Sequence, residues 1–138
     1  MVRIPFLAER GEYLRQTEEC VRQYGNKELL LLLRLMQETG IRMGDILELR
    51  PEDVQGRELL VVERKFGATD YYRNPDGSLP IISKATAELL IPGDDGKFFH
   101  HDKRYYVILL RRAFPNMEFS FRYLRCYVLD MRRIQEKV

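Results

Sequence analysis

Apolar residues recur along the chain at helical spacing, in segments that turn-forming residues separate. The densest segment is 27–39, where five consecutive leucines at 29–33 make the predicted helix apolar on most sides. Such a helix is expected at the buried centre of a domain. Asn26 can cap it with a side-chain oxygen, and Gly40 can end it in the left-handed conformation. A preceding helix is expected at 8–24.

Beyond Gly40, a short helix is expected at 43–49, closed by Pro51, and the composition then changes to that of β-strands. Three strands are expected at 59–62, 68–72 and 79–82. Residues 74–77, Asn-Pro-Asp-Gly, have strong turn chemistry. Pro80 cannot donate a ladder hydrogen bond, which places the last strand at a sheet edge.

Helical patterns return after the strands. Ser83 can cap a helix that runs to residue 90, and a loop at 91–96 follows. Further helices are expected at about 101–113 and 120–135, separated by a proline. The order of helices, a small three-stranded antiparallel sheet and helices predicts an α+β fold that is mainly α-helical. The 138 residues, 45% hydrophobic, are enough for a single domain spanning 1–138.

The net charge of +2 hides an uneven distribution. Residues 1–96 hold 13 basic and 17 acidic side chains, whereas residues 97–138 hold 10 basic and 4 acidic ones. A basic C-terminal third suggests a face that meets an anion such as a phosphate backbone. Solvated arginines on exposed helices are the alternative explanation.

The same composition argues against several other classes of protein. Cys20 and Cys126 are too few for a disulfide framework or a cysteine zinc site. The five-leucine run is too short to span a membrane, and the first residues lack the apolar core of a signal peptide. A cytoplasmic location is therefore the expectation.

The most informative segment is 38–50, which contains Thr39-Gly40-Ile41-Arg42. Gly40 can reverse the chain and place Arg42 at the start of the next helix, where a guanidinium and backbone N–H groups can both address a phosphate. Asp45, one turn later, could hold that guanidinium in place. A helix–turn–helix corner with a solvated arginine is the simpler alternative.

The stretch ETGIRMGDILELRPEDV resembles the first arginine box of the tyrosine recombinase (phage integrase) catalytic domain. That family follows the box with a strand, a β-turn carrying a catalytic lysine, and a returning strand. Lys65, in the context Lys-Phe-Gly, and the edge Leu-Pro-Ile-Ile at 79–82 match these features. The resemblance extends over residues 5–135 in element order, and it implies a tyrosine-recombinase-like fold.

The family's second arginine box, His-x-Leu-Arg, has its best match at Arg122-Tyr-Leu-Arg125. Arg125 keeps the Leu-Arg pair, and a shifted alignment would put Arg122 in the arginine place. Arg122 can donate hydrogen bonds to a phosphate but cannot act as a general base. Only 13 residues follow Arg125, so the family's later His or Trp box and its tyrosine nucleophile have no counterpart. The chain could be a truncated piece of an enzyme or a naturally tail-less relative.

The resemblance implies in-line attack of a tyrosine on a DNA phosphodiester, which leaves a 3′-phosphotyrosine. Two arginines, Arg42 and Arg125, would stabilise the charge on the nonbridging oxygens, and Lys65 would protonate the leaving 5′-oxygen. The implied partners are double-stranded DNA and, through the missing tail, other recombinase subunits. No cofactor or metal ion is expected.

Other candidates are less specific. The sequence His100-His101-Asp102 suggests a metal, but adjacent side chains diverge and no third ligand is suitably spaced. Tyr72 and Arg73 could contact DNA bases or phosphate, or simply pack on a strand. Nonspecific DNA contacts could come from Arg111, Arg112, Arg132 and Arg133.

Two other functions remain open from the sequence. One is a noncatalytic DNA-binding regulator or protein-interaction module that reuses the fold. The other is a helical domain in which the Thr-Gly-Ile-Arg match arises by chance.

Overall fold

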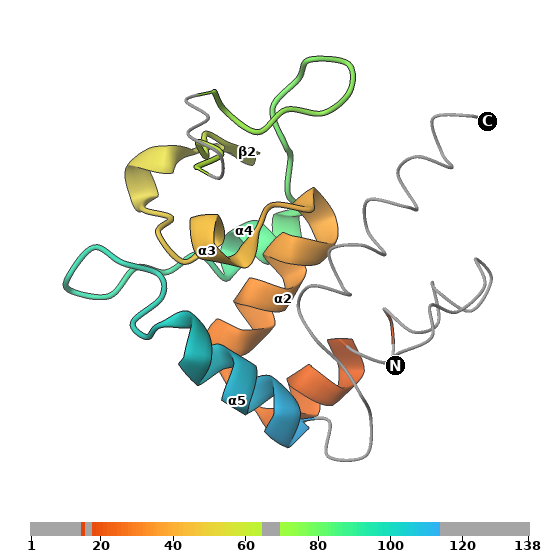
Figure 1. Ribbon diagram of the computed structural model, residues 1–138, viewed down its shortest axis with the longest axis vertical. Coiled ribbons are helices and arrows are strands. Elements are labelled where there is room, and N and C mark those ends of the chain that lie inside the picture. Colours follow the sequence, from red (N-terminus) through yellow and green to blue (C-terminus); the bar gives the residue numbers. More distant parts are fainter. Residues whose placement is uncertain (1–14, 16–17, 65–69, 114–138) are drawn as a thin grey trace.

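The leucine-rich segment forms α2 (Lys27–Thr39), the helix around which the other elements are arranged (Figure 1). The computed structural model describes residues 15, 18–64 and 70–113. Leu29, Leu32, Leu33 and Leu35 of α2 are completely buried. The expectation that this helix forms the buried centre is confirmed.

Both ends of α2 follow local sequence rules. The side-chain oxygen of Asn26 accepts a hydrogen bond from the backbone N–H of Leu29 at 3.0 Å, which satisfies a donor that the first helical turn leaves free. Gly40 adopts a φ of 71°, and its N–H donates to the carbonyl of Met36 at 2.9 Å. Glycine enters this left-handed region at no steric cost, so the chain leaves the helix here.

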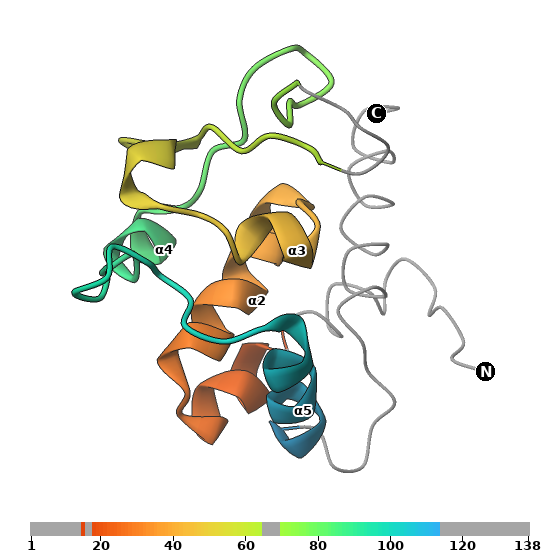
Figure 2. The same ribbon diagram turned by 60° about the vertical axis from the view of Figure 1, so that its left-hand side comes forward.

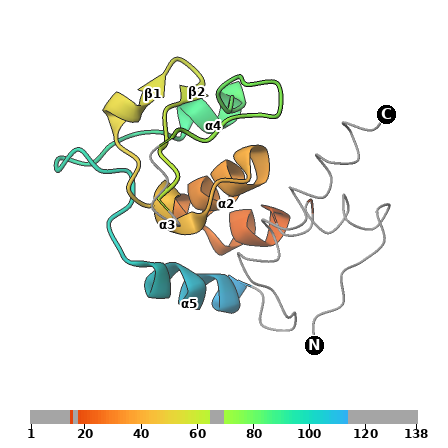
Figure 3. The same ribbon diagram turned by 45° about the horizontal axis from the view of Figure 1, so that its top comes forward.

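Three shorter helices contact α2: α3 (Met43–Ile46), α4 (Lys84–Glu88) and α5 (Lys103–Ala113). The strands and α4 lie on one side of α2, and α5 lies on the other (Figure 3). Residues 18–24 are also helical, and Val21 is completely buried in the same core. About half of the described residues are helical, so the chain combines helices with a small amount of strand.

The sheet is smaller than expected from the sequence. In the described part of the chain it has two antiparallel strands, β1 (Val54–Gln55) and β2 (Glu58–Leu59), which follow a 3₁₀ helix, η1 (Pro51–Asp53). The segments expected to be the second and third strands make only isolated bridges, Val62 with Tyr71 and Glu58 with Ile81. The described residues therefore do not confirm a three-stranded sheet, and residues 68–69 of the second expected strand lie outside them.

Two features account for the difference. Pro80 has no N–H, so it can only accept, and it does so from Leu59 at 3.0 Å. Between the two bridges the chain closes its own turn, in which the N–H of Asn74 donates to the carbonyl of Ser78 at 2.7 Å. This turn separates the two pairings and interrupts a continuous ladder.

The helices after α2 are slightly shorter than predicted. Helix α3 ends at Ile46 rather than at residue 49, and α4 ends at Glu88 rather than at residue 90. Ser83 caps α4 as expected, since its hydroxyl accepts from the N–H of Thr86 at 3.2 Å. The helix expected at 120–135 lies outside the described residues. Figure 2 shows α3 between α2 and the strand-forming segment.

Candidate functional site

The turn between α2 and α3 is held by a short series of local hydrogen bonds. The Thr39 hydroxyl donates to the carbonyl of Leu35 at 2.6 Å and accepts from the N–H of Ile41 at 3.2 Å. Ile41 is completely buried, which anchors the turn in the core. Arg42 then takes an extended conformation as the N-cap of α3. The Thr-Gly-Ile-Arg sequence thus forms a well-anchored turn from which the side chain of Arg42 extends.

Two side chains contact the Arg42 guanidinium. Its Nη1 donates to Oε1 of Glu63 at 2.5 Å and to the hydroxyl of Tyr72 at 3.2 Å. The Tyr72 hydroxyl donates in turn to Oδ2 of Asp45 at 2.6 Å. We call Arg42, Asp45, Glu63 and Tyr72 the Arg42 network. It joins the start of α3 to the two segments paired at the Val62–Tyr71 bridge.

The electrostatics keep both donors of this network protonated. The hydrogen bond to Glu63 raises the pKa of Arg42 above its usual value, so the guanidinium stays charged. Burial raises the pKa of Tyr72, and its hydrogen bond to the Asp45 carboxylate raises it further. The phenol therefore remains a donor at neutral pH.

Only part of the Arg42 guanidinium has a hydrogen-bond partner in the described residues. Its Nε and Nη2 have no partner among the residues that the structure describes, and the Arg42 side chain is 26% exposed. A guanidinium has five N–H donors in a fixed plane, and its free edge can bind two oxygens of an anion at once. The Arg42 network therefore presents a fixed cation with a vacant bidentate edge.

Two sequence-predicted residues, Asp45 and Tyr72, belong to the Arg42 network. Asp45, expected to hold the Arg42 guanidinium in place, accepts from the hydroxyl of Tyr72, which in turn contacts the guanidinium. Tyr72 was a candidate either for contact with DNA or for packing on a strand; its ring packs against the core and its hydroxyl belongs to the Arg42 network. Tyr72 is thus a positioning residue for Arg42.

Arg73 lies apart from the Arg42 network. Its Nη1 donates to the carbonyl of Gly77 at 3.0 Å, and its Nε is 3.9 Å from Asp70. Arg111 and Arg112 are exposed in the last turn of α5, which lies across α2 from the strands (Figure 3). Five candidates lie outside the described residues: Lys65, Arg122, Arg125, Arg132 and Arg133.

The three consecutive residues His100, His101 and Asp102 point to different partners. His100 lies between Glu28 and Asp95, His101 stacks on the ring of Tyr105 at 3.7 Å, and Asp102 accepts from the N–H of Tyr105 at 3.0 Å. Asp102 thus caps the start of α5. No group of three metal-binding side chains gathers in the described part of the chain.

Two features of the structure were not found from the sequence. One is Glu63, the carboxylate partner of Arg42, whose only signal is an acidic residue two positions before Lys65. The other is a cluster around Glu28, whose Oε1 accepts from the hydroxyl of Tyr106 at 2.6 Å and from the N–H of His100 at 2.9 Å. Both depend on pairings between distant segments.

No family model, curated protein or solved structure matches this chain. Among the described residues, no helix has both the length and the apolar character needed to cross a membrane.

Proposed function

We propose that the chain is a DNA-binding domain of the tyrosine recombinase type, in which the Arg42 network binds a phosphodiester. The observation that carries the proposal is the vacant edge of the Arg42 guanidinium, held in place by Glu63 and Tyr72. A preorganised arginine can stabilise the charge that develops on nonbridging phosphate oxygens during strand cleavage and rejoining.

The remaining roles follow from the resemblance. Lys65 would act as the general acid that protonates the leaving 5′-oxygen, two positions along the chain from Glu63. Arg125, or Arg122 in the shifted alignment, would complete the phosphate clamp. No residue is assigned as the nucleophile, so we expect this chain by itself to bind DNA without cleaving it.

The test is the affinity of the full chain for a fluorescently labelled duplex over a range of salt concentrations. The Arg42→Gln variant should bind at least about tenfold more weakly, and the slope of log affinity against log salt should fall by about 1, because one phosphate contact is lost. The control is Arg22→Gln, which removes an exposed arginine paired with Glu18 in the 18–24 helix. Equal affinity of the Arg42 variant and the unmodified protein would refute the proposal.

A second experiment concerns the missing nucleophile. On a nicked suicide duplex, the proposal predicts no covalent protein–DNA adduct from this chain alone. An adduct that survives denaturing electrophoresis would contradict that part and would require a tyrosine nucleophile within the chain.

A further inference from the structure

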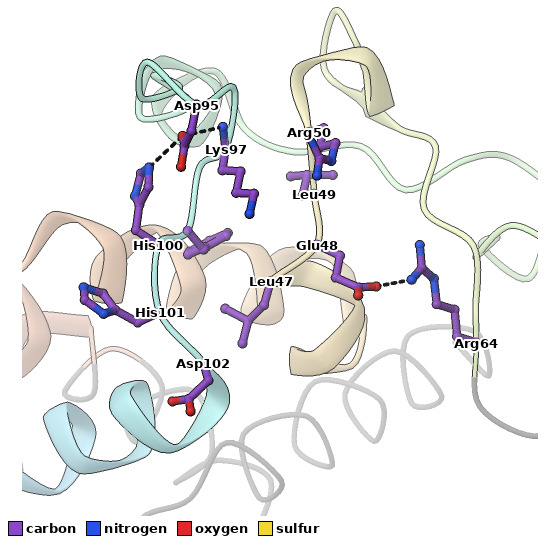
Figure 4. A pocket seen from close by; sticks show the side chains of 11 residues that line it. Leu47, Glu48, Leu49, Arg50, Arg64, Asp95, Lys97, His100, His101 and Asp102 are labelled. Carbon is purple, nitrogen blue, oxygen red and sulfur yellow. Dashed lines mark hydrogen bonds and ion pairs between the residues drawn. The ribbon is translucent and has the colours of Figure 1, made fainter.

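A cavity in the described part of the protein lies beside the Arg42 network rather than within it. It has a volume of about 580 Å³ and opens between residues 47–50 and residues 95–102 (Figure 4). Its apolar floor includes Leu49 and Phe99, both 3% exposed. Arg64 reaches its rim from the strand side.

The carboxylates on the walls already have partners. Glu48 forms an ion pair with Arg64. Asp95 accepts from the backbone N–H of Lys97 at 3.0 Å and contacts Nε2 of His100 at 3.1 Å. The carboxylate of Asp102 caps α5. These contacts fix the three carboxylates in place, and Arg64 offsets the charge of Glu48.

Two cations on the walls, Arg50 and Lys97, are not held by an ion pair within the described residues. The side chains of Arg50 and Lys97 are exposed and make no ion pair or side-chain hydrogen bond with any residue the structure describes. They come from opposite sides of the opening, and the Lys97 side chain extends into it (Figure 4). Arg50 and Lys97 thus bring two cationic donors to the cavity from two separate segments.

The wall that carries Lys97 is fixed in place. The His100 ring lies between Glu28, at 3.4 Å from Nδ1, and Asp95, and this ties the loop to the first turn of α2. Gly93 allows the close approach, since a Cβ there would lie 2.7 Å from Nε2 of His100. A fixed wall reduces the entropy lost when a ligand binds.

We propose that this cavity is a phosphate-binding site in which Arg50 and Lys97 contact the anion from opposite walls. Two cationic donors that make no ion pair or side-chain hydrogen bond within the described residues suit a phosphate, which offers several acceptor oxygens, and the fixed loop keeps Lys97 positioned. The phosphate belongs either to a DNA backbone or to a free phosphate ester. The inference does not rest on the function proposed for the Arg42 network.

The first test is a titration of the isotope-labelled full chain with inorganic phosphate, followed by NMR at constant ionic strength, with chloride as the reference salt. The amide signals of residues 47–50 and 95–102 should shift together and saturate at a dissociation constant of about 1 mM. The Arg50→Gln, Lys97→Gln double variant should weaken this binding at least about tenfold. The matched control is Arg104→Gln, Lys84→Gln, which removes the same charge from exposed positions outside the cavity and should bind as the unmodified protein does.

Shifts that fail to saturate, or that are the same in the double variant, would overturn the inference. Arg42→Gln should leave phosphate binding in the cavity unchanged, so failure of the DNA-binding proposal and failure of this one give different results. A second titration identifies the source of the phosphate. If the double variant weakens binding to a DNA duplex, the phosphate is that of the backbone; if it weakens only the binding of adenosine monophosphate, the phosphate is that of a free ester.

Discussion

The carboxylate of Glu63 lies 2.5 Å from Nη1 of Arg42, although 21 positions separate the two residues. A carboxylate resembles two oxygens of a phosphate in shape and charge, so Glu63 occupies one position that an external anion could take. Both side chains are partly exposed, at 35% for Glu63 and 26% for Arg42, which keeps the ion pair within reach of solvent and ligands. Glu63 therefore both orients Arg42 and competes for it.

Glu63→Gln should increase the affinity for duplex DNA about two- to fivefold, because a partly exposed ion pair contributes up to about 1 kcal/mol. The measurement is fluorescence anisotropy with a labelled duplex at low salt. Glu88→Gln is the matched control, since Glu88 is an exposed carboxylate at the end of α4. If both variants gain DNA affinity equally, the change in net charge explains the gain, and Glu63 does not compete with DNA for Arg42.

Tyr72→Phe should weaken DNA binding by loosening Arg42, and it should lower the free energy of unfolding by about 1 kcal/mol, the net value of a typical hydrogen bond. Asp45→Asn should have the same effects, because it changes the carboxylate that accepts the hydrogen bond from the Tyr72 hydroxyl. A double-mutant cycle should therefore give a coupling energy of about 0.5–3 kcal/mol.

The control for this cycle is Tyr71→Phe, because Tyr71 is 42% exposed and its hydroxyl has no partner within the described residues. Additive losses from the Tyr72 and Asp45 variants would show that Asp45 does not position Arg42 through Tyr72.

Tyr106→Phe should destabilise the fold by about 1–3 kcal/mol, since it removes a buried hydroxyl that donates a hydrogen bond to a carboxylate. The residue is completely buried, and its hydroxyl donates to Glu28 at 2.6 Å and accepts from the N–H of His100 at 3.2 Å. Urea denaturation monitored by circular dichroism measures the change. Tyr105→Phe, at a neighbouring exposed ring, should change stability by less than about 0.5 kcal/mol; equal losses in the two variants would refute a special role for Tyr106.

The contact between His100 and Glu28 should make stability depend on pH. Hydrogen bonds to Glu28 and Asp95 raise the pKa of His100 above its ordinary 6.5. Partial burial opposes ionisation of Glu28, but hydrogen bonds from Tyr106 and His100 outweigh it and hold the pKa of Glu28 below 4.5. The contribution of His100 is complete below pH 6.5 and is lost as the pH rises through its folded-state pKa, whereas that of Glu28 is lost as the pH falls below 4.5.

His100→Gln should therefore cost more stability at about pH 5.5 than at about pH 9 in urea denaturation. The matched control is His101→Gln, because His101 stacks on Tyr105 and has no ion pair with a carboxylate in the described part of the chain. A loss of stability that is the same at both pH values would contradict the assignment of charge to His100.

Several local features could be predicted from the sequence because the interactions that produce them span only a few residues. The Asn26 cap joins positions three apart, and the left-handed Gly40 bonds back four positions. The apolar run of α2 indicates burial in any fold that the chain adopts. The emergence of Arg42 from a tight turn follows from the same local chemistry.

The sheet was the least accurate part of the prediction. Strand composition at 79–82 indicates an extended segment, and the segment does pair with the strand before it through Ile81. The length of that pairing depends on the turn at Asn74 and on where Pro80 meets its neighbour. Propensity measures the preference of a residue for a half-buried extended surface and contains no information on register.

By itself, the sequence determined the central helix, its two ends and the placement of Arg42, since these depend on neighbours within one or two turns. Only the tertiary structure decided what surrounds Arg42 and His100. Glu63 and Tyr72 reach Arg42 across 21 and 30 positions, and Glu28 reaches His100 across 72. Packing around α2 brings these side chains together. The resulting short distances determine which part of the Arg42 guanidinium is hydrogen bonded, and they couple the titration of His100 to that of Glu28.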